Sequence, residues 1–297
     1  MDTKQLMTLV AIADQGTFAK AAKIVHRTPS AVSQQMQTLE QELGASIFDR
    51  SNRPPSFNSK GLYLVEIAKK VLQLVDEAKY VITDQKMVGP LYIGAVRTSA
   101  SCLLPNAIVS LSKDFPDLKI KLRVDLSRAL VKKVTNGSLD LAIVAENSSL
   151  PPELQWSPFI REPLVVIAPD GTPKMSSKKM LETLPIIRLR SGVPLAKLID
   201  TELARIAVIP NFIAEIDTVA AIVECVIAGL GAAVVPELSV RSISGHSLQT
   251  VPFGTPQIMR QLGIVRRHDS HRTQAIKTVH KYMAGFAGSF GVLPDPD

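Results

Sequence analysis

The sequence predicts an all-α N-terminal unit with a small β-hairpin, then one long helix, then an α/β region of two lobes. Apolar residues recur at helical spacing through residues 1–60, and a heptad seam runs through residues 64–82. Strand-like and helical segments then alternate from residue 91 onward. A chain of 297 residues is long enough for two or three folding units.

Two short helices are predicted to open the chain. Residues 6–13 place apolar side chains three and four positions apart, on one helical face, and Gly16 ends this first helix. The second helix begins near Thr17 and carries small alanine side chains that permit close packing. It breaks at His26–Arg27.

A third helix is predicted over residues 28–43. Thr28 is a good N-cap, Pro29 suits the first helical position because no N–H is needed there, and Gly44 supplies the C-terminal stop. The apolar stripe is Val32, Met36, Leu39 and Leu43. The opposite face is uncharged and rich in hydroxyl and amide groups: Ser30, Ser33, Gln34, Gln37 and Gln41.

This polar face favours contact with DNA, because an α-helix fits the major groove and Gln can bridge the N6/N7 edge of adenine. The alternative is an ordinary solvated helix face. A predicted hairpin, or wing, follows in residues 47–58, with Arg50 and Arg53 at its end and tip, where arginine can contact phosphates or enter the minor groove. The alternative for both is surface arginine that aids solubility. The short link between the second and third helices favours a winged helix-turn-helix.

In these segments the chain resembles the LysR-type transcriptional regulators. The resemblance is carried by Leu6–Ala13, Gly16–Ala22, Thr28–Ser33, Leu39–Glu40, Leu43–Gly44, Ile47–Phe48, Arg50, Arg53 and Gly61–Leu62. One departure is Gln34, where the family commonly has Arg; glutamine favours adenine over a phosphate or guanine contact. The residues expected to contact DNA are Thr28, Pro29, Ser30, Ser33, Gln34, Gln37, Arg50 and Arg53.

A linker helix, capped by Asn58 or Ser59, is predicted to run to about Lys86. Its apolar seam alternates spacings of four and three residues: Leu64, Ala68, Val71, Val75, Ala78 and Ile82. The seam could pack on the core of its own chain or pair with the same helix of another subunit. A dimer is favoured because it also matches a two-fold operator, and the resemblance implies the same.

The remaining segments predict an α/β region. Strands are expected at 91–96, 118–126, 139–145, 163–168, 185–189, 212–216, 232–235 and 257–266, and helices at 104–115, 129–134, 195–206, 219–227 and 271–283. The β-α-β-α-β order of the first series predicts a parallel sheet.

The resemblance extends through residues 137–143, 162–164 and 226–236 and implies a two-lobed domain of the periplasmic-binding-protein type. It places the crossovers between lobes near Ile160–Glu162 and Leu262–Arg266. The expected domains are a DNA-binding domain (1–60), a linker and dimerisation helix (61–88) and an effector-binding domain (89–297). Lobe I is expected over about 89–161 and 267–297, and lobe II over about 162–266.

A ligand of such a domain is expected beyond the carboxyl ends of the strands. The segment after the first strand offers hydroxyls and free N–H groups at a helix start, which suit an anion. The predicted effector-binding residues are Thr98, Ser99, Ser101, Ser127, Arg190 and Thr218, with Arg97 and Arg188 as further candidates to pair with an anionic ligand. For each hydroxyl, a simple helix-capping role is the alternative.

Composition narrows the class of protein. Net charge is +7, but residues 1–60 hold only seven Lys or Arg against five Asp or Glu, so charge does not locate the DNA site. Two distant cysteines predict neither a disulfide framework nor a metal cluster, and no signal peptide or membrane span is evident, so a cytoplasmic location is expected. No catalytic motif is legible, and neither catalysis nor a cofactor is expected.

These inferences converge on a DNA-binding regulator that responds to a small molecule. Its expected partners are a double-stranded DNA operator, the effector, further copies of itself as a homodimer or homotetramer, and RNA polymerase, without a membrane. A solute-binding transport protein is the first alternative, and it would need an export signal and no DNA domain. An α/β enzyme is the second, and it would need a nucleophile–base pair.

Overall fold

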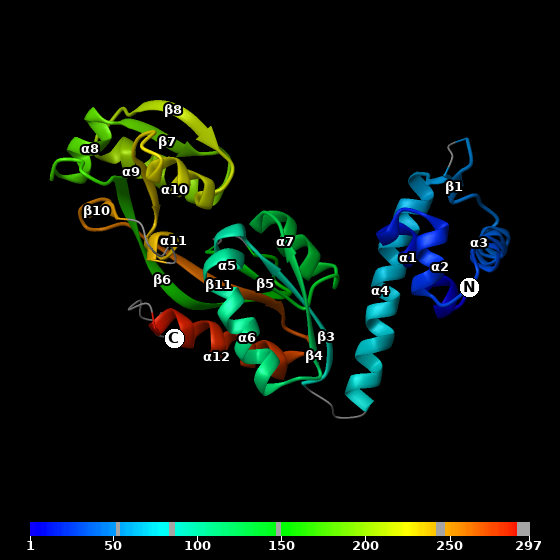
Figure 1. The fold of residues 1–297 in the computed structure, drawn as a ribbon. Helices are drawn as coiled ribbons and strands as arrows, with labels where there is room; N and C mark the ends of the chain where they lie inside the picture. Colours follow the sequence, from blue (N-terminus) through cyan, green and yellow to red (C-terminus); the bar gives the residue numbers. More distant parts are fainter. Residues whose placement is uncertain (52–53, 83–86, 147–149, 242–246, 290–297) are drawn as a thin grey trace. The chain divides into compact units, whose positions relative to one another are not determined.

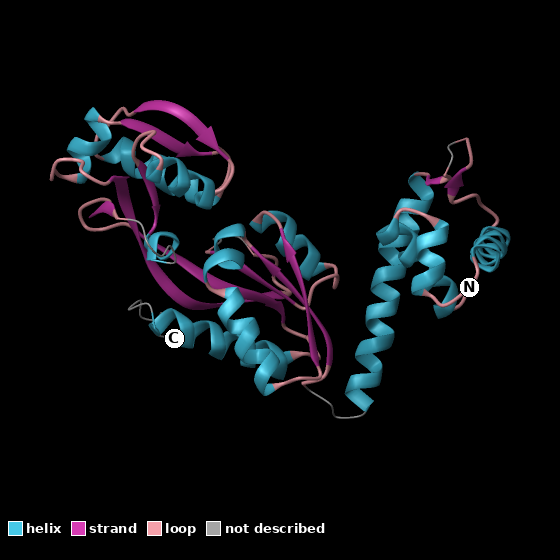
Figure 2. Ribbon diagram, viewed as in Figure 1, coloured by secondary structure: helices cyan, strands magenta, loops and turns pink. Residues whose placement is uncertain are grey.

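The computed structural model describes residues 1–51, 54–82, 87–146, 150–241 and 247–289. The chain divides into two compact units, residues 1–85 and residues 86–297 (Figure 1). The first unit is helical apart from one small hairpin, and the second mixes helices and strands (Figure 2). The fold class predicted from the sequence is confirmed. None of the described helices combines the length and hydropathy that a membrane span requires.

Three helices begin the N-terminal unit: α1 (Thr3–Gln15), α2 (Phe18–Ile24) and α3 (Pro29–Leu43). Their boundaries follow from local capping. Asp2 forms a capping box on α1, and the hydroxyls of Thr17 and Thr28 accept the amides that begin α2 and α3. Gly16 and Gly44 end α1 and α3 with φ of 74° and 63°, a left-handed conformation that favours glycine.

The wing and the long helix complete this unit: β1 (Phe48–Asp49), β2 (Ser56–Phe57) and α4 (Ser59–Ile82). β1 and β2 pair antiparallel, and the Phe48 ring lies 5.0 Å from Phe18 and 4.7 Å from Phe57, centroid to centroid. This aromatic cluster fixes the wing to the helices. Val65 and Ala68 of α4 are buried in the same core.

The strands of the C-terminal unit are β3 (Gly89–Ala95), β4 (Leu118–Val124), β5 (Leu141–Ala145), β6 (Leu154–Pro169), β7 (Pro185–Leu189), β8 (Asn211–Ile216), β9 (Ala233–Pro236), β10 (Leu248–Pro252) and β11 (Met259–Arg267). The helices are α5 (Arg97–Cys102), α6 (Leu104–Asp114), α7 (Ser127–Thr135), α8 (Ser177–Thr183), α9 (Pro194–Arg205), α10 (Val219–Ile227), α11 (Glu237–Arg241) and α12 (Thr273–Ser289). The sequence did not predict α5, α8, α11, β10 or the first half of β6.

One sheet runs through both lobes in the order β10-β6-β11-β5-β3-β4, and β9 also pairs with β6. The predicted parallel pairing is correct for β3 with β4 and β5, and β7 pairs with β8 in parallel as well. The prediction is incomplete, because β11 is antiparallel to both β5 and β6. The long antiparallel strands β6 and β11 connect the two lobes (Figure 1).

The two lobes have separate cores. Lobe I packs α6 and α12 on one side of β3, β5 and β11, and α7 on the other. Lobe II gathers its core around the second half of β6, with β7, β9 and α10. The β6 crossover lies near the expected residues 160–162. The second crossover was predicted wrongly: residues 262–266 pair with β5 inside lobe I, so β11 crosses at about residues 259–261.

Candidate functional site

The outer face of α3 is a surface of uncharged polar groups. Ser30, Gln34 and Gln37 are exposed, and Ser33 is half-buried beside them. Within the described residues, the side-chain amides of Gln34 and Gln37 have no hydrogen-bond partner. On the opposite side Val32, Met36 and Leu39 are buried, whereas Leu43, which the sequence placed in the same stripe, is 39% exposed.

The start of α3 is held by its own side chains. The Thr28 hydroxyl accepts the Ala31 amide at 3.2 Å and lies 3.0 Å from the Ser30 hydroxyl, while Pro29 occupies the first helical position. Thr28, Pro29 and Ser30 are all exposed. The N-terminal turn, which contacts base edges in helix-turn-helix proteins, is therefore accessible and capped by its own side chains.

Glu40 ties the wing to α3, a role that the sequence analysis missed. Partial burial opposes ionisation of Glu40, but hydrogen bonds from the amides of Ile47 and Phe48 and from the Ser46 hydroxyl, with the charge of Arg50, outweigh it and lower the pKa. Arg50 Nη2 donates to Glu40 Oε2 at 2.7 Å and stays exposed. Arg53 lies outside the described residues.

The predicted dimerisation seam on α4 divides into two parts. Ala68 is fully buried against α1 of its own chain, so it offers no surface to a partner and that assignment is corrected. Leu64, Val71 and Val75 are half-buried and Ala78 is exposed. The side chain of Ile82 lies outside the described residues. Leu74, outside the predicted seam, is 60% exposed and widens the apolar strip.

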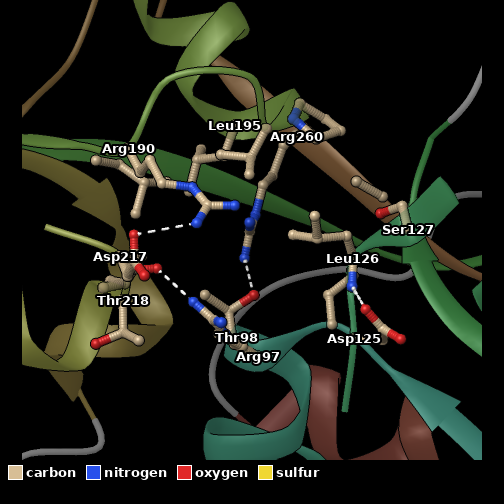
Figure 3. A pocket seen from close by; sticks show the side chains of 16 residues that line it. Arg97, Thr98, Asp125, Leu126, Ser127, Arg190, Leu195, Asp217, Thr218 and Arg260 are labelled. Carbon is tan, nitrogen blue, oxygen red and sulfur yellow. Dashed lines mark hydrogen bonds and ion pairs between the residues drawn. The ribbon is translucent and has the colours of Figure 1, made fainter. Parts of the chain in front are cut away.

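A small cavity of about 90 Å³ lies between the two lobes (Figure 3). Lobe I contributes the ends of β3, β4 and β5, and lobe II the segments that follow β7 and β8. The lining residues are Val96, Arg97, Thr98, Asp125, Leu126, Ser127, Ala145, Leu189, Arg190, Val193, Pro194, Leu195, Asp217, Thr218, Val219 and Arg260. The cavity therefore lies at the carboxyl ends of the strands, where the sequence analysis expected it.

Four of the six predicted effector residues line this cavity: Thr98, Ser127, Arg190 and Thr218. Ser99 and Ser101 do not. Residues 97–102 form the helix α5, in which successive side chains turn by roughly 100°, so Ser99 points away from Thr98, while Ser101 lies about one turn further along the helix and outside the cavity lining. Ser99 is 1% exposed, and the Ser101 hydroxyl donates to the Arg97 carbonyl.

The arginines around the cavity already have protein partners. Arg97 Nη1 donates across the lobes to the Asp217 carbonyl at 2.9 Å, and Arg190 Nη1 lies 3.5 Å from Asp217 Oδ1. Arg188 lies outside the cavity lining, paired with Asp200 at 3.2 Å and stacked over Phe212.

Arg260 and Glu162 form a buried ion pair that the sequence analysis did not predict. The two residues face each other in register on β11 and β6, where the strands cross between lobes, and are 8% and 1% exposed. Burial raises the pKa of Glu162, although the adjacent guanidinium opposes this. Arg260 Nη2 also donates to Thr98 Oγ1 at 3.0 Å and so links the crossover to the cavity (Figure 3).

Asp125, like Asp217, belongs to the cavity wall and carries a carboxylate. Lys133 Nζ donates to Asp125 Oδ2 at 2.7 Å, and the Leu126 amide donates to Oδ1 at 2.8 Å. These bonds, that of Lys133 foremost, lower the pKa of Asp125. No cluster of three or more His, Cys, Asp or Glu that could hold a metal is found among the described residues.

Both units match known protein families. Residues 3–62 match the model of the bacterial regulatory helix-turn-helix protein of the lysR family, and residues 84–287 match the LysR substrate binding domain. A probable RuBisCO transcriptional regulator of Guillardia theta is 32% identical over 93% of each chain. An uncharacterized HTH-type transcriptional regulator of Bacillus subtilis, YusT, is 29% identical over 94% of each.

Solved structures have the same fold. A cysteine-to-aspartate variant of full-length OxyR from Pseudomonas aeruginosa has a TM-score of 0.71 at 25% identity, covering 95% of this chain and 94% of that one. CbnR, described as a LysR family transcriptional regulator, has a TM-score of 0.73 at 17% identity, over 95% and 99%. CbnR has also been solved in complex with its target DNA.

Proposed function

The chain belongs to the LysR family of transcriptional regulators, and on that basis we propose that it binds a specific DNA operator and that a small anionic effector between its lobes modulates this binding. DNA is contacted by Thr28, Pro29, Ser30, Ser33, Gln34, Gln37, Arg50 and Arg53. Effector contacts come from Thr98, Ser127, Arg190 and Thr218, joined by Arg260.

The exposed amide and hydroxyl face of α3 is the observation that carries the DNA-reading proposal. Charge would bind any duplex through its phosphates, whereas Gln34 and Gln37 can form paired hydrogen bonds with base edges. The ion pair between Arg50 and Glu40 holds the arginine beside α3, where its guanidinium supplies a phosphate contact. The arrangement separates base reading on α3 from positioning at the wing.

Effector binding is coupled to DNA binding through subunit geometry in this proposal. The protein assembles as a homodimer or homotetramer through the apolar strip of α4. RNA polymerase is the further partner. An effector that favours one arrangement of the lobes changes the spacing of the recognition helices. Coupling of this kind is reciprocal, so operator DNA alters effector affinity by the same factor.

Sequencing of genomic fragments retained by the purified full-length protein tests the DNA-binding proposal. We expect one or a few fragments with two-fold symmetric sites to be enriched over bulk DNA at moderate salt. A uniform sample of the genome would contradict the proposal. Turnover of any small molecule by pure protein would favour the alternative of an α/β enzyme.

Replacing Ser33 or Gln37 by Ala will weaken binding to the selected site by about 1–3 kcal/mol and leave binding to random DNA nearly unchanged. The lost hydrogen bonds go to base edges, which random DNA does not offer in register. Fluorescence anisotropy with both duplexes measures the two affinities. Gln41→Ala, on the same face near the C-terminal end of α3, is the matched control; equal losses on both duplexes would refute base reading.

Replacing Thr98 by Ala will shift the effector dose–response of operator binding to higher concentration and leave DNA affinity without effector unchanged. The change removes a hydroxyl of the cavity wall that also positions Arg260. Footprinting across a metabolite panel supplies the effector for this titration. Ser101→Ala, on the same helix but outside the cavity, is the control, and an unchanged Thr98→Ala curve would remove Thr98 from the site.

A further inference from the structure

The interlobe cavity is smaller than a typical small-molecule site. Its volume is about 90 Å³, whereas small-molecule sites typically enclose roughly 300–1,000 Å³. A second hollow of about 930 Å³ opens directly beside it. The two share part of their lining: Leu126, Ser127, Ala145, Val193 and Pro194. One elongated ligand can therefore occupy both, with one end in the inner cavity and its body in the outer hollow.

The outer hollow has an excess of positive charge. Arg128 and Lys132, one turn apart on α7 of lobe I, and Lys197 on α9 of lobe II line it, against the single carboxylate of Glu146. Within the described residues, none of these three cations has an ion-pair partner. The arginines of the inner cavity, by contrast, are already bonded to protein groups. The three cations of the outer hollow also come from both lobes.

Two helix N-termini reinforce this charge. The N-cap residues of α7 and α9, Leu126 and Val193, lie in the wall that the two hollows share, and their apolar side chains cannot accept a hydrogen bond from the first-turn amides. Their first-turn N–H groups carry partial positive charge, which adds to that of the three cations. By contrast, Thr218 caps α10 with its own hydroxyl.

We propose that the effector is an elongated dianion, with a carboxylate in the inner cavity beside Thr98 and Arg260 and a second anionic group in the outer hollow. That second group, a phosphate or another carboxylate, lies among Arg128, Lys132 and Lys197. Because these cations belong to different lobes, the second group also bridges the lobes. This inference rests on the proposed effector site and names the class of ligand that fills it.

Calorimetric titration of the full-length protein with three probes of matched chain length tests the inference. The probes are butyrate, glutarate and butyrate with a terminal phosphonate. Charge-assisted hydrogen bonds predict that at least one of the two dianions binds about tenfold to a hundredfold more tightly than butyrate. The ranking of glutarate against the phosphonate identifies which anionic group the outer hollow takes.

The double variant Lys132→Ala/Lys197→Ala is expected to bring both dianions to within about twofold of butyrate and to leave butyrate affinity unchanged. Lys121→Ala, an exposed lysine of β4 outside both hollows, should leave all three affinities unchanged. Thermal melting of each variant confirms that it is folded.

Three results would overturn the inference: no probe binds, the dianions bind no more tightly than butyrate, or the double variant keeps the preference. Retention of a specific genomic fragment is measured on the same preparations. If butyrate binds in a Thr98-dependent way without a dianion preference, the effector cleft stands and only the dianion assignment fails. If the wild-type protein retains no specific genomic fragment, the proposed function itself fails.

Discussion

Replacing Arg260 by Met will destabilise the C-terminal unit by about 3–5 kcal/mol, because it leaves the Glu162 carboxyl buried without its partner. Methionine keeps much of the length and the apolar stem of arginine, so lost packing adds little. Differential scanning calorimetry of the full chain should show the C-terminal transition lowered by roughly 10 °C or more, with the N-terminal transition unchanged. The effector response should fall as well, since Thr98 loses its donor.

The double variant Glu162→Gln/Arg260→Met separates the ion pair from its surroundings. Glu162→Gln alone leaves a buried guanidinium, which does not lose its charge, and is destabilising as well. Removing both charges should recover much of the loss, so the double-mutant cycle will be strongly non-additive. Additive losses would mean that the two residues contribute through packing and not through their charges.

The pH dependence of Arg260→Met follows from the direction of the Glu162 shift. Burial raises the folded-state pKa of Glu162 above the ordinary value of 4.5, and removing Arg260 removes the group that opposes this rise. A carboxyl with a raised folded-state pKa stabilises the fold at pH values below its unfolded-state pKa and loses that contribution as pH rises through the folded-state pKa. The variant should therefore lie closest to wild-type stability near pH 4.5 and fall behind as pH rises. A deficit that grows toward acid pH would contradict this assignment.

Local signals explain why most elements could be predicted from the sequence. Thr28 and Pro29 begin α3 and Gly44 ends it through interactions with residues only a few positions away in the sequence. The structure places all three as expected. α5, α8 and α11 have five to seven residues each, too few for a periodic apolar pattern to indicate them. The antiparallel pairing of β6 with β11 joins segments about 100 residues apart, and pairing at that distance leaves no local pattern.

The same limit applies to the candidate sites. Thr98 could be predicted because it follows a strand, but Arg260 could not, since its importance arises from Glu162 on another strand and from a contact with α5. Ser99 and Ser101 were assigned to the cleft with Thr98 as hydroxyls at a helix start, but α5 buries Ser99 and places Ser101 one turn beyond Thr98, outside the cavity lining. Ala68 fits the heptad seam, yet a spacing of three and four does not distinguish a partner helix from α1 of the same chain.

Replacing Gly61 by Ala will unfold or strongly destabilise the N-terminal unit and abolish specific DNA binding. A Cβ at Gly61 would lie 2.1 Å from the Ile47 carbonyl oxygen and 2.8 Å from Phe57 Cδ1, so the wing or the start of α4 must move. The Ile47 oxygen is a backbone atom that also accepts the Asn58 amide, so it cannot simply rotate away. Overpacking typically costs about 1–3 kcal/mol, and a clash with backbone puts this site at or above the upper end, although alanine is the better helix former.

Calorimetry and DNA binding of Gly61→Ala should give matching results. The N-terminal transition is expected to fall by roughly 10–20 °C, the C-terminal transition to stay in place, and selective DNA retention to disappear at physiological temperature. Gly285→Ala in α12 is the matched control, because nothing lies within 4 Å of its added Cβ. There the helix propensity of alanine acts alone and should stabilise the C-terminal unit by about 0.5–1 kcal/mol. The two substitutions are chemically identical and should shift stability in opposite directions; an N-terminal unit as stable as wild type in Gly61→Ala would show that the wing does not pack on α4 as described.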